Sequence, residues 1–189
     1  MGYVSPTIIE ERSLNIASMD VFSRLMMDRV IFLGSEIDPD VANIIIAQLL
    51  FLDQQKNEEI TMHINSPGGD VDSGLAIYDT MQFVKSKIKT VVVGLAASMA
   101  SVILAAGNER LALPHSKVLI HQPHGACGGQ AKDIFITVKE FEKDYKTLAE
   151  ILAKHTGQDF QKVYDDMDRD HWLDSNEALD YHIIDKIVK

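Results

Sequence analysis

Ser98 has the residue type of a nucleophile, and its neighbours are small. An apolar segment, 91–93, is followed by Gly94-Leu95-Ala96-Ala97, and a helix is expected to begin near Met99. A hydroxyl at this turn would face free backbone N–H groups and the positive end of the helix dipole, which favour a developing oxyanion. An N-cap is the commoner use of serine at a helix start, and the segment alone favours that alternative. The Gly-x-Ser-x-Gly motif of α/β-hydrolases is missing here.

A serine nucleophile needs a base, and His121 is the best placed of the seven histidines. It ends the apolar segment 117–120 and precedes Gln122-Pro123, where the chain is expected to turn and expose the imidazole. A structural histidine at a strand end is an equally good interpretation. His121 and His124 also have a spacing compatible with a metal, although no helix carries them and no cluster of cysteines or carboxylates adjoins them.

The acidic segment 165–170 offers several carboxylates that could orient the base. The same region has a rival interpretation, because residues 166–177 place carboxylates at positions 1, 3, 5, 9 and 12 of an EF-hand calcium loop. His171 stands at position 6, where that loop needs glycine. Calcium binding is therefore an alternative interpretation, but the segment lacks the glycine that the loop requires.

Two glycine-rich segments could bring backbone close to a substrate. Gly68 and Gly69 follow Asn65-Ser66-Pro67 between an expected strand and helix, where aligned N–H groups could form half of an oxyanion hole. The glycines after His121 suit an edge strand to which an extended peptide could add; they are Gly125, Gly128 and Gly129. A plain turn and an irregular loop are the ordinary alternatives.

These residues are spread over a regular alternation of strands and helices, which is typical of one α/β domain. Residues 1–18 show no clear period and are expected to form a mobile arm. Strands are expected at 29–33, 60–65, 90–93, 109–113, 117–121 and 183–188. Helices are expected at 38–54, 72–86, 99–106, 131–155, 158–167 and 175–181.

The expected helix 131–155 is the longest element. Its apolar residues step by three and four, and Gly157 supplies a C-terminal stop. A helix of about 25 residues is roughly 38 Å long. Part of this helix could therefore pack on another subunit. An equally good interpretation is that the helix only covers the sheet of its own chain.

Composition limits the classes of partner. The chain has 189 residues and a net charge of −10, so an acidic surface would repel a nucleic-acid backbone. The single cysteine excludes an intrachain disulfide. The first residues lack a signal-peptide pattern, and the most apolar run, 91–106, is too short to span a bilayer comfortably. We expect a cytoplasmic protein that binds neither nucleic acid nor membrane.

Four segments, in this order, resemble the proteolytic-subunit family of Clp proteases. They are Asn65-Ser66-Pro67-Gly68-Gly69, Gly94-Leu95-Ala96-Ala97-Ser98-Met99, Ile120-His121-Gln122-Pro123 and Asp168-Arg169-Asp170. The similarity runs from about residue 23 to residue 178, nearly the whole chain. It implies a ClpP/crotonase-like α/β fold, a spiral of βαβ units with a protruding handle helix at 131–155.

The resemblance also implies roles for individual residues. Ser98 would be the nucleophile, His121 the general base and then acid, and Asp170 the carboxylate that orients it, in a serine endopeptidase that cleaves unfolded polypeptides. The resemblance implies that such an enzyme needs no metal and no cofactor of its own, because ATP is used by a partner ATPase. The other implied site residues are the oxyanion-hole residues Gly69 and Met99 and the substrate-binding Gly125, Gly128 and Gly129.

The implied assembly is a barrel of two stacked heptamers fed by a Clp-family AAA+ unfoldase. Residues 1–18 would line its axial pore, residues 19–189 would form the catalytic domain, and Gln122, Asp168 and Arg169 would lie at the contact between rings. Thr61 and His63 stand where the family usually has aromatic residues of the ATPase-docking pocket. A paralogue in a mixed barrel, acting as a non-catalytic scaffold, and a calcium-binding module remain the alternatives.

Overall fold

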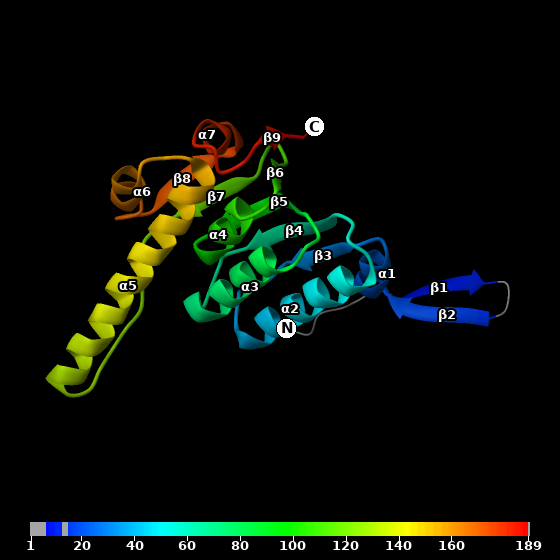
Figure 1. Ribbon diagram of the computed structural model, residues 1–189, viewed down its shortest axis with the longest axis horizontal. Helices are drawn as coiled ribbons and strands as arrows, with labels where there is room; N and C mark the ends of the chain where they lie inside the picture. The colour runs from blue at the N-terminus through cyan, green and yellow to red at the C-terminus, as the bar shows by residue number, and fades with distance from the viewer. Residues whose placement is uncertain (1–6, 13–14, 189) are drawn as a thin grey trace.

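A parallel β-sheet organises the chain in a computed structural model, which describes residues 7–12 and 15–188 (Figure 1). Its main path has the strand order β3-β4-β5-β6-β9. These strands are β3 (Val30–Leu33), β4 (Ile60–Ser66), β5 (Ile88–Ala97), β6 (Glu109–Ala112) and β9 (Lys186–Ile187). Two further strands leave this path: β7 (Lys117–Ile120) pairs in parallel with β5, and β8 (His171–Asp174) pairs antiparallel with β7. The expected α/β fold is confirmed.

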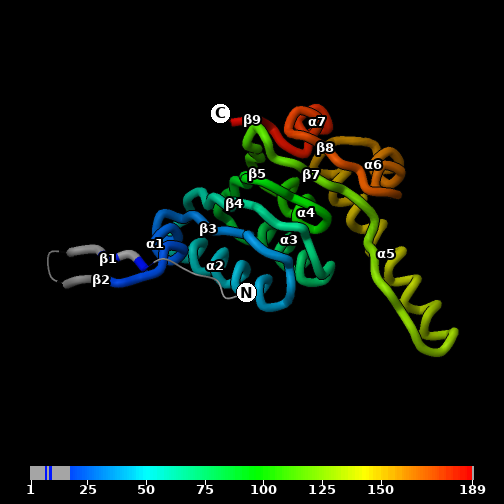
Figure 2. Tube along the Cα trace, turned by 180° about the vertical axis from the view of Figure 1, so that it is seen from behind, coloured from blue at the N-terminus to red at the C-terminus, as the bar shows by residue number. Residues whose placement is uncertain are grey.

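Side-chain caps define the helix starts. Asp38 caps α2 (Pro39–Gln55), Asp70 caps α3 (Val71–Phe83), and Asp174 forms a capping box with α7 (Ser175–Asp180). The remaining helices are α1 (Val21–Met27), α4 (Met99–Ala105), α5 (Ala131–Thr156) and α6 (Phe160–Asp166). In Figure 1, α2, α3 and α4 lie in front of the sheet, and the strands face the viewer in the reverse view of Figure 2.

Strand β5 changes neighbours along its length. Its first half, Lys89 to Val92, pairs with β6, whereas Leu95 to Ala97 pairs with β7. The carboxyl ends of β4, β5 and β7 therefore meet at one edge of the sheet, where α/β proteins place their ligand sites. Every residue of α4, which leaves from that edge, is buried. The helix that begins at this edge is therefore part of the core.

Two elements project from this body. One is the antiparallel hairpin of β1 (Thr7–Arg12) and β2 (Asn15–Asp20). The other is the N-terminal half of α5, which extends from the opposite end of the molecule (Figure 1). The sequence suggested no strand in the arm predicted at 1–18, whereas its residues 7–12 and 15–18 pair as strands. Its remaining residues, 1–6 and 13–14, lie outside the described part of the chain. The domain division at 18/19 stays a prediction.

Helix α5 has a packed half and a free half. Tyr145, Leu148 and Leu152 are buried in the core, whereas Phe135 and Ile136 are 68% and 60% exposed. Gly157 ends the helix in the left-handed conformation, at φ 70°. The predicted long helix is confirmed to within one residue. Among the described residues, no helix combines the length and apolar character needed to cross a membrane.

Candidate active site

Ser98 is the single residue between β5 and α4. Strand β5 runs as far as Ala97, so the residues expected to form a turn before Ser98 belong to the strand. The change of direction falls on Ser98 itself, which has φ 55° and ψ −127°. A non-glycine residue at positive φ costs about 1–3 kcal/mol and is typical of functional sites. The strain turns this side chain out of the strand at the carboxyl edge.

The Ser98 hydroxyl does not cap α4. Its side chain makes no cap hydrogen bond, although it occupies the N-cap position. The backbone is held instead: the Ser98 N–H donates to the Leu119 carbonyl at 2.9 Å, and the Ser98 carbonyl accepts from the Ser101 hydroxyl at 2.6 Å. The N-cap alternative therefore describes the position of Ser98 but not the use of its hydroxyl.

Gly68 packs directly against the serine. A Cβ on Gly68 would lie 2.8 Å from the Ser98 Cβ and 2.5 Å from the Ala97 carbonyl oxygen, and Gly68 has φ +87°. Only glycine fits such a contact and such a conformation. Gly68 had no separate predicted role, because a Pro-Gly-Gly turn does not reveal which glycine meets a distant strand.

The two predicted oxyanion-hole residues lie on either side of this contact. Gly69 follows Gly68, and the Met99 nitrogen lies 2.9 Å from the Cβ that Gly68 lacks. In the described part of the chain, neither the Gly69 nor the Met99 N–H appears as a donor in a turn, loop or cap hydrogen bond. Both N–H groups are thus available to an acceptor, and their role stays a prediction.

His121 and Asp170 meet through strand pairing. Strand β7 ends at Ile120, whose partner in the antiparallel register is His171, the first residue of β8. The next pair in that register is His121 and Asp170, and the His121 Nδ1 lies 3.2 Å from Asp170 Oδ1. No strand was expected at β8 from the sequence. The structure thus brings one carboxylate of the acidic segment 165–170 to His121.

The three residues predicted at a subunit contact gather beside this pair. Gln122 Nε2 donates to the Asp168 carbonyl at 2.6 Å, and the Gln122 N–H donates to the Met167 carbonyl at 2.6 Å. Arg169 Nε lies 3.7 Å from an Asp168 carboxylate oxygen, and its side chain is 90% exposed. These contacts tie the His121 and Asp170 segments together, and a role between subunits stays a prediction.

Ser98 and His121 both line a cleft of about 640 Å³. The His121 ring is mostly buried, and its Nε2 is buried without a hydrogen-bond partner among the described residues. Ser98 Oγ therefore makes no hydrogen bond to that nitrogen in this conformation, as is common for catalytic pairs without substrate. An imidazole held by a carboxylate on Nδ1 and open at Nε2 can accept a proton from a hydroxyl.

The glycine-rich segment after His121 borders the same cleft without forming a strand. Residues 121–128 have no strand partner, so in the isolated chain the loop alternative describes this segment and the suggested edge strand is not formed. The segment runs back along α5 in both views (Figures 1 and 2), and a Cβ on Gly125 would lie 2.9 Å from the Phe141 ring. Gly128 and Gly129 have open space around them. Substrate binding by these glycines stays a prediction.

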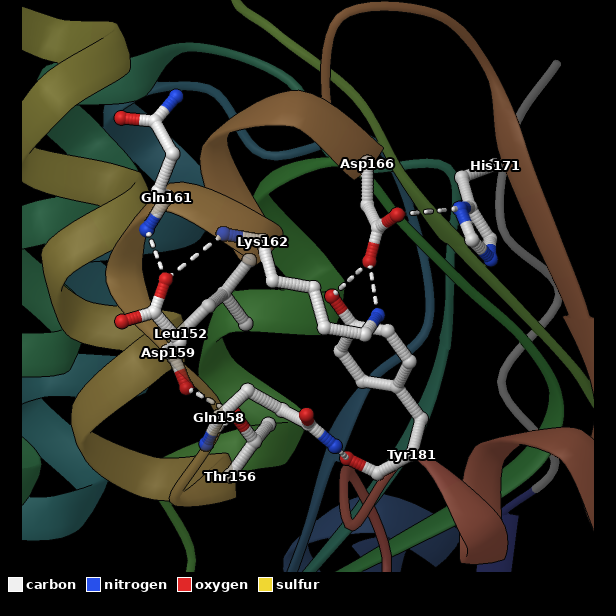
Figure 3. A network of polar contacts seen from close by, with 9 residues as sticks. All are labelled: Leu152, Thr156, Gln158, Asp159, Gln161, Lys162, Asp166, His171 and Tyr181. Carbon is white, nitrogen blue, oxygen red and sulfur yellow. Dashed lines mark hydrogen bonds and ion pairs between the residues drawn. The ribbon is translucent and has the colours of Figure 1, made fainter.

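The carboxylates of the EF-hand alternative point to different partners. Asp166 accepts from Lys162 and from the Tyr181 hydroxyl (Figure 3). Asp170 contacts His121, and Asp174 and Glu177 form the capping box of α7. No group of three or more His, Cys, Asp or Glu residues suited to a metal ion occurs in the described part of the chain. These partners remove the geometric basis for a calcium loop.

Thr61 and His63 lie on β4, away from the cleft. His63 stacks on Phe32, with ring centroids 5.2 Å apart and an interplanar angle of 23°. Burial lowers the pKa of His63 below its usual value. This position therefore presents an aromatic ring.

The chain was compared with known protein families and curated proteins. The Clp protease family model matches residues 12–189. The chain is 54% identical to an ATP-dependent Clp protease proteolytic subunit of Bacteroides fragilis, over 99% of this chain and 92% of that protein. It is 53% identical to the protein of that name from Porphyromonas gingivalis, over 100% of this chain and 86% of that protein. The sequence match covers almost the full length of the chain, and the chain belongs to the Clp protease family.

Proposed function

We propose that this chain is a serine endopeptidase subunit that cleaves unfolded polypeptides. The observation that carries the proposal is the state of His121, whose Nδ1 contacts Asp170 while its Nε2 is buried and unpartnered beside the cleft that Ser98 lines. A carboxylate on Nδ1 fixes the tautomer that leaves Nε2 as a proton acceptor. The family relatives, which are named proteolytic subunits, support the same activity.

The proposed reaction proceeds in two halves. Ser98 Oγ attacks the peptide carbonyl carbon as His121 takes its proton, and Asp170 stabilises the imidazolium that forms. When the tetrahedral adduct collapses, His121 gives that proton to the departing amine and an acyl-serine remains. A water molecule, deprotonated by His121, then attacks the acyl carbon, and return of the proton to Ser98 releases the carboxylic acid product.

Two backbone N–H groups would stabilise the charge that develops on the carbonyl oxygen. We assign these donors to Gly69 and Met99, which flank the contact between Gly68 and Ser98. Such donors act without reorganisation because the backbone is fixed, and removing one typically costs about 10²–10³ in rate. Gly125, Gly128 and Gly129 would hold the substrate backbone once a peptide pairs with the extended segment.

The proposal includes the assembly and its partners. The exposed apolar half of α5 and the cluster of Gln122, Asp168 and Arg169 suit contacts with other copies of this chain or a paralogue, in two stacked heptamers. A Clp-family AAA+ ATPase would deliver unfolded polypeptides and hydrolyse the ATP, so the chain itself needs no cofactor. We propose a cytoplasmic location.

An active-site phosphonate probe tests the catalytic proposal. The assembled wild-type protein should gain one probe per chain by intact-mass analysis, and Ser98→Ala should gain none. Ser35→Ala is the matched control, because Ser35 is exposed and lies outside the cleft. Labelling of Ser98→Ala at the wild-type rate would contradict the proposal.

The second candidate is a non-catalytic scaffold subunit. It requires only that the particle assembles, and it is compatible with the same structure, in which Ser98 makes no hydrogen bond to His121 Nε2. A scaffold predicts an assembled particle of normal mass that neither reacts with the phosphonate nor cleaves unfolded protein. The same labelling experiment therefore separates the two candidates.

A further inference from the structure

The cleft beside Ser98 has an unbalanced charge. Its lining includes four carboxylates, those of Glu36, Asp70, Asp72 and Asp144, and none of the described residues that line it is lysine or arginine. The cleft is a candidate ligand site on grounds independent of this charge, because the Ser98 hydroxyl makes no cap hydrogen bond and His121 Nε2 is buried without a partner. A ligand in the cleft therefore meets a negative surface.

The four carboxylates differ in how they are engaged. Asp70 caps α3, where it accepts from the Ser73 N–H at 2.8 Å and from the Ser73 hydroxyl. No hydrogen bond or ion pair to a described residue engages the side chains of Asp72, Asp144 or Glu36. These three carboxylates are consequently available to a ligand, whereas Asp70 has a structural role.

Asp72 and Asp144 come from separate elements, and their negative charges repel each other. Asp72 lies in the first turn of α3, and Asp144 lies on α5, beyond Phe141 of the same cleft lining. Burial, and then the negative charges of Asp72 and Glu140, raise the pKa of the Asp144 carboxyl above its usual value. A positive group between the two carboxylates would relieve this repulsion.

The charge of Lys143 acts in the opposite direction and lowers the pKa of Asp144, but this side chain is paired with a carboxylate outside the cleft lining. Lys143 precedes Asp144 but bonds to Glu140 at 2.7 Å and does not line the cleft. The protein thus supplies no fixed cation to neutralise Asp72 and Asp144 from within the lining. Phe141, Leu119 and Pro123 add apolar surface to the same lining, which suits the aliphatic stem of a lysine or arginine.

We propose that Asp72 and Asp144 are specificity-determining residues that make this cleft select polypeptide segments carrying lysine or arginine. The inference rests on the proposed peptidase function and adds the class of side chain that the site prefers. Partly exposed ion pairs are individually weak, so the preference is a bias between substrates and not an absolute requirement. It acts on substrate binding, because neither carboxylate contacts Ser98 or His121.

The test uses internally quenched peptides cleaved by the assembled full-chain protein. The peptides are identical except for Lys, Gln or Glu placed in turn at each position near the cleaved bond. At the most responsive position, wild type should cleave the Lys peptide about 5- to 20-fold more efficiently than the Glu peptide, by kcat/KM. This ratio should shrink at high salt, because ions screen the carboxylates.

The decisive variant is Asp72→Asn/Asp144→Asn, which keeps side-chain size. Its Lys-to-Glu ratio, which compares two peptides on the same enzyme, should fall toward 1. Glu142→Gln is the matched control: it removes one negative charge from an exposed position of α5 that does not line the cleft. If the double variant fails to assemble, the salt series on wild type and the single variants carry the test.

Two results would overturn the inference while leaving the function intact. One is a wild-type enzyme that reacts with the phosphonate at Ser98 but cleaves Lys and Glu peptides equally at every position. The other is an unchanged Lys-to-Glu ratio in the double variant. Absence of both labelling and cleavage would overturn the proposed function itself, and with it this inference.

Discussion

Two regions of the molecule each hold a largely buried histidine with a hydrogen bond to another side chain, and they use it differently. At the junction of α3 and α5, His155 Nε2 lies 3.0 Å from the Tyr78 hydroxyl, and Arg110 donates to the His155 carbonyl at 2.8 Å. At the cleft, His121 Nδ1 contacts a carboxylate, and its Nε2 has no partner among the described residues.

The partner of the ring decides what each histidine can do. Burial, with the charges of Lys154 and Arg110, lowers the pKa of His155 to about 4, so this ring stays neutral and structural near pH 7. Asp170 can instead stabilise a positive charge on His121, and the open Nε2 can take a proton. A carboxylate and a free nitrogen, more than burial, distinguish the candidate catalytic histidine.

The largest expected effect follows from removing the base. His121→Ala should lower kcat for peptide cleavage by about 10⁴- to 10⁶-fold, because loss of a triad histidine removes proton transfer altogether. The measurement is peptide turnover per assembled particle. His115→Ala serves as the control, since His115 is exposed and outside the cleft, and it should retain full activity. A His121→Ala enzyme with a tenth of wild-type activity would contradict the assignment.

Removing only the carboxylate charge should have the next largest effect. Asp170→Asn keeps the size of the side chain but cannot stabilise the imidazolium, so kcat should fall by about 10⁴-fold. Asp165→Asn, an exposed neighbour on α6, should leave turnover unchanged. Equal activity of both variants would show that Asp170 is not the orienting residue.

His155 predicts a pH dependence of stability. In the unfolded chain an imidazole binds a proton near pH 6.5, whereas folded His155 does so near pH 4. Between these values the unfolded state binds more protons, so the free energy of unfolding should decrease as pH falls from about 6.5 toward 4. Above pH 7, His155 should contribute nothing to the change of the free energy of unfolding with pH.

Denaturant unfolding of wild type and His155→Phe across this range measures that contribution. The variant cannot titrate at position 155, so its stability should fall less steeply with acid than that of wild type. Parallel curves for the two proteins would show that His155 does not resist protonation in the folded state.

The smallest expected effect concerns the hydroxyl that holds His155. Tyr78→Phe deletes one part-buried hydrogen bond and should lower the free energy of unfolding by about 1 kcal/mol without changing peptide turnover. Tyr164→Phe is the matched control, because no described residue bonds to the Tyr164 hydroxyl. A large loss of activity in Tyr78→Phe would contradict the conclusion that the His155 region is structural and only the His121 region is catalytic.

Local sequence features determined much of the fold. Asp38 followed by proline predicted the start of α2, and Gly157 predicted the end of α5, because caps and stops depend on neighbours in the chain. Ser98 and His121 were identifiable as candidates because each follows an apolar strand. The hairpin of β1 and β2 was missed, since its sequence has no clear alternation and its pairing needs the other strand.

Only the tertiary structure decided which groups meet. From residue types alone, several carboxylates of 165–170 could orient the base, and the choice of Asp170 came from the family resemblance. The register of β7 and β8 brings that residue opposite His121. The register joins segments about 50 residues apart and depends on packing across the sheet, which no local pattern encodes. The strained backbone of Ser98 and its contact with Gly68 also depend on packing between segments that are distant in the chain.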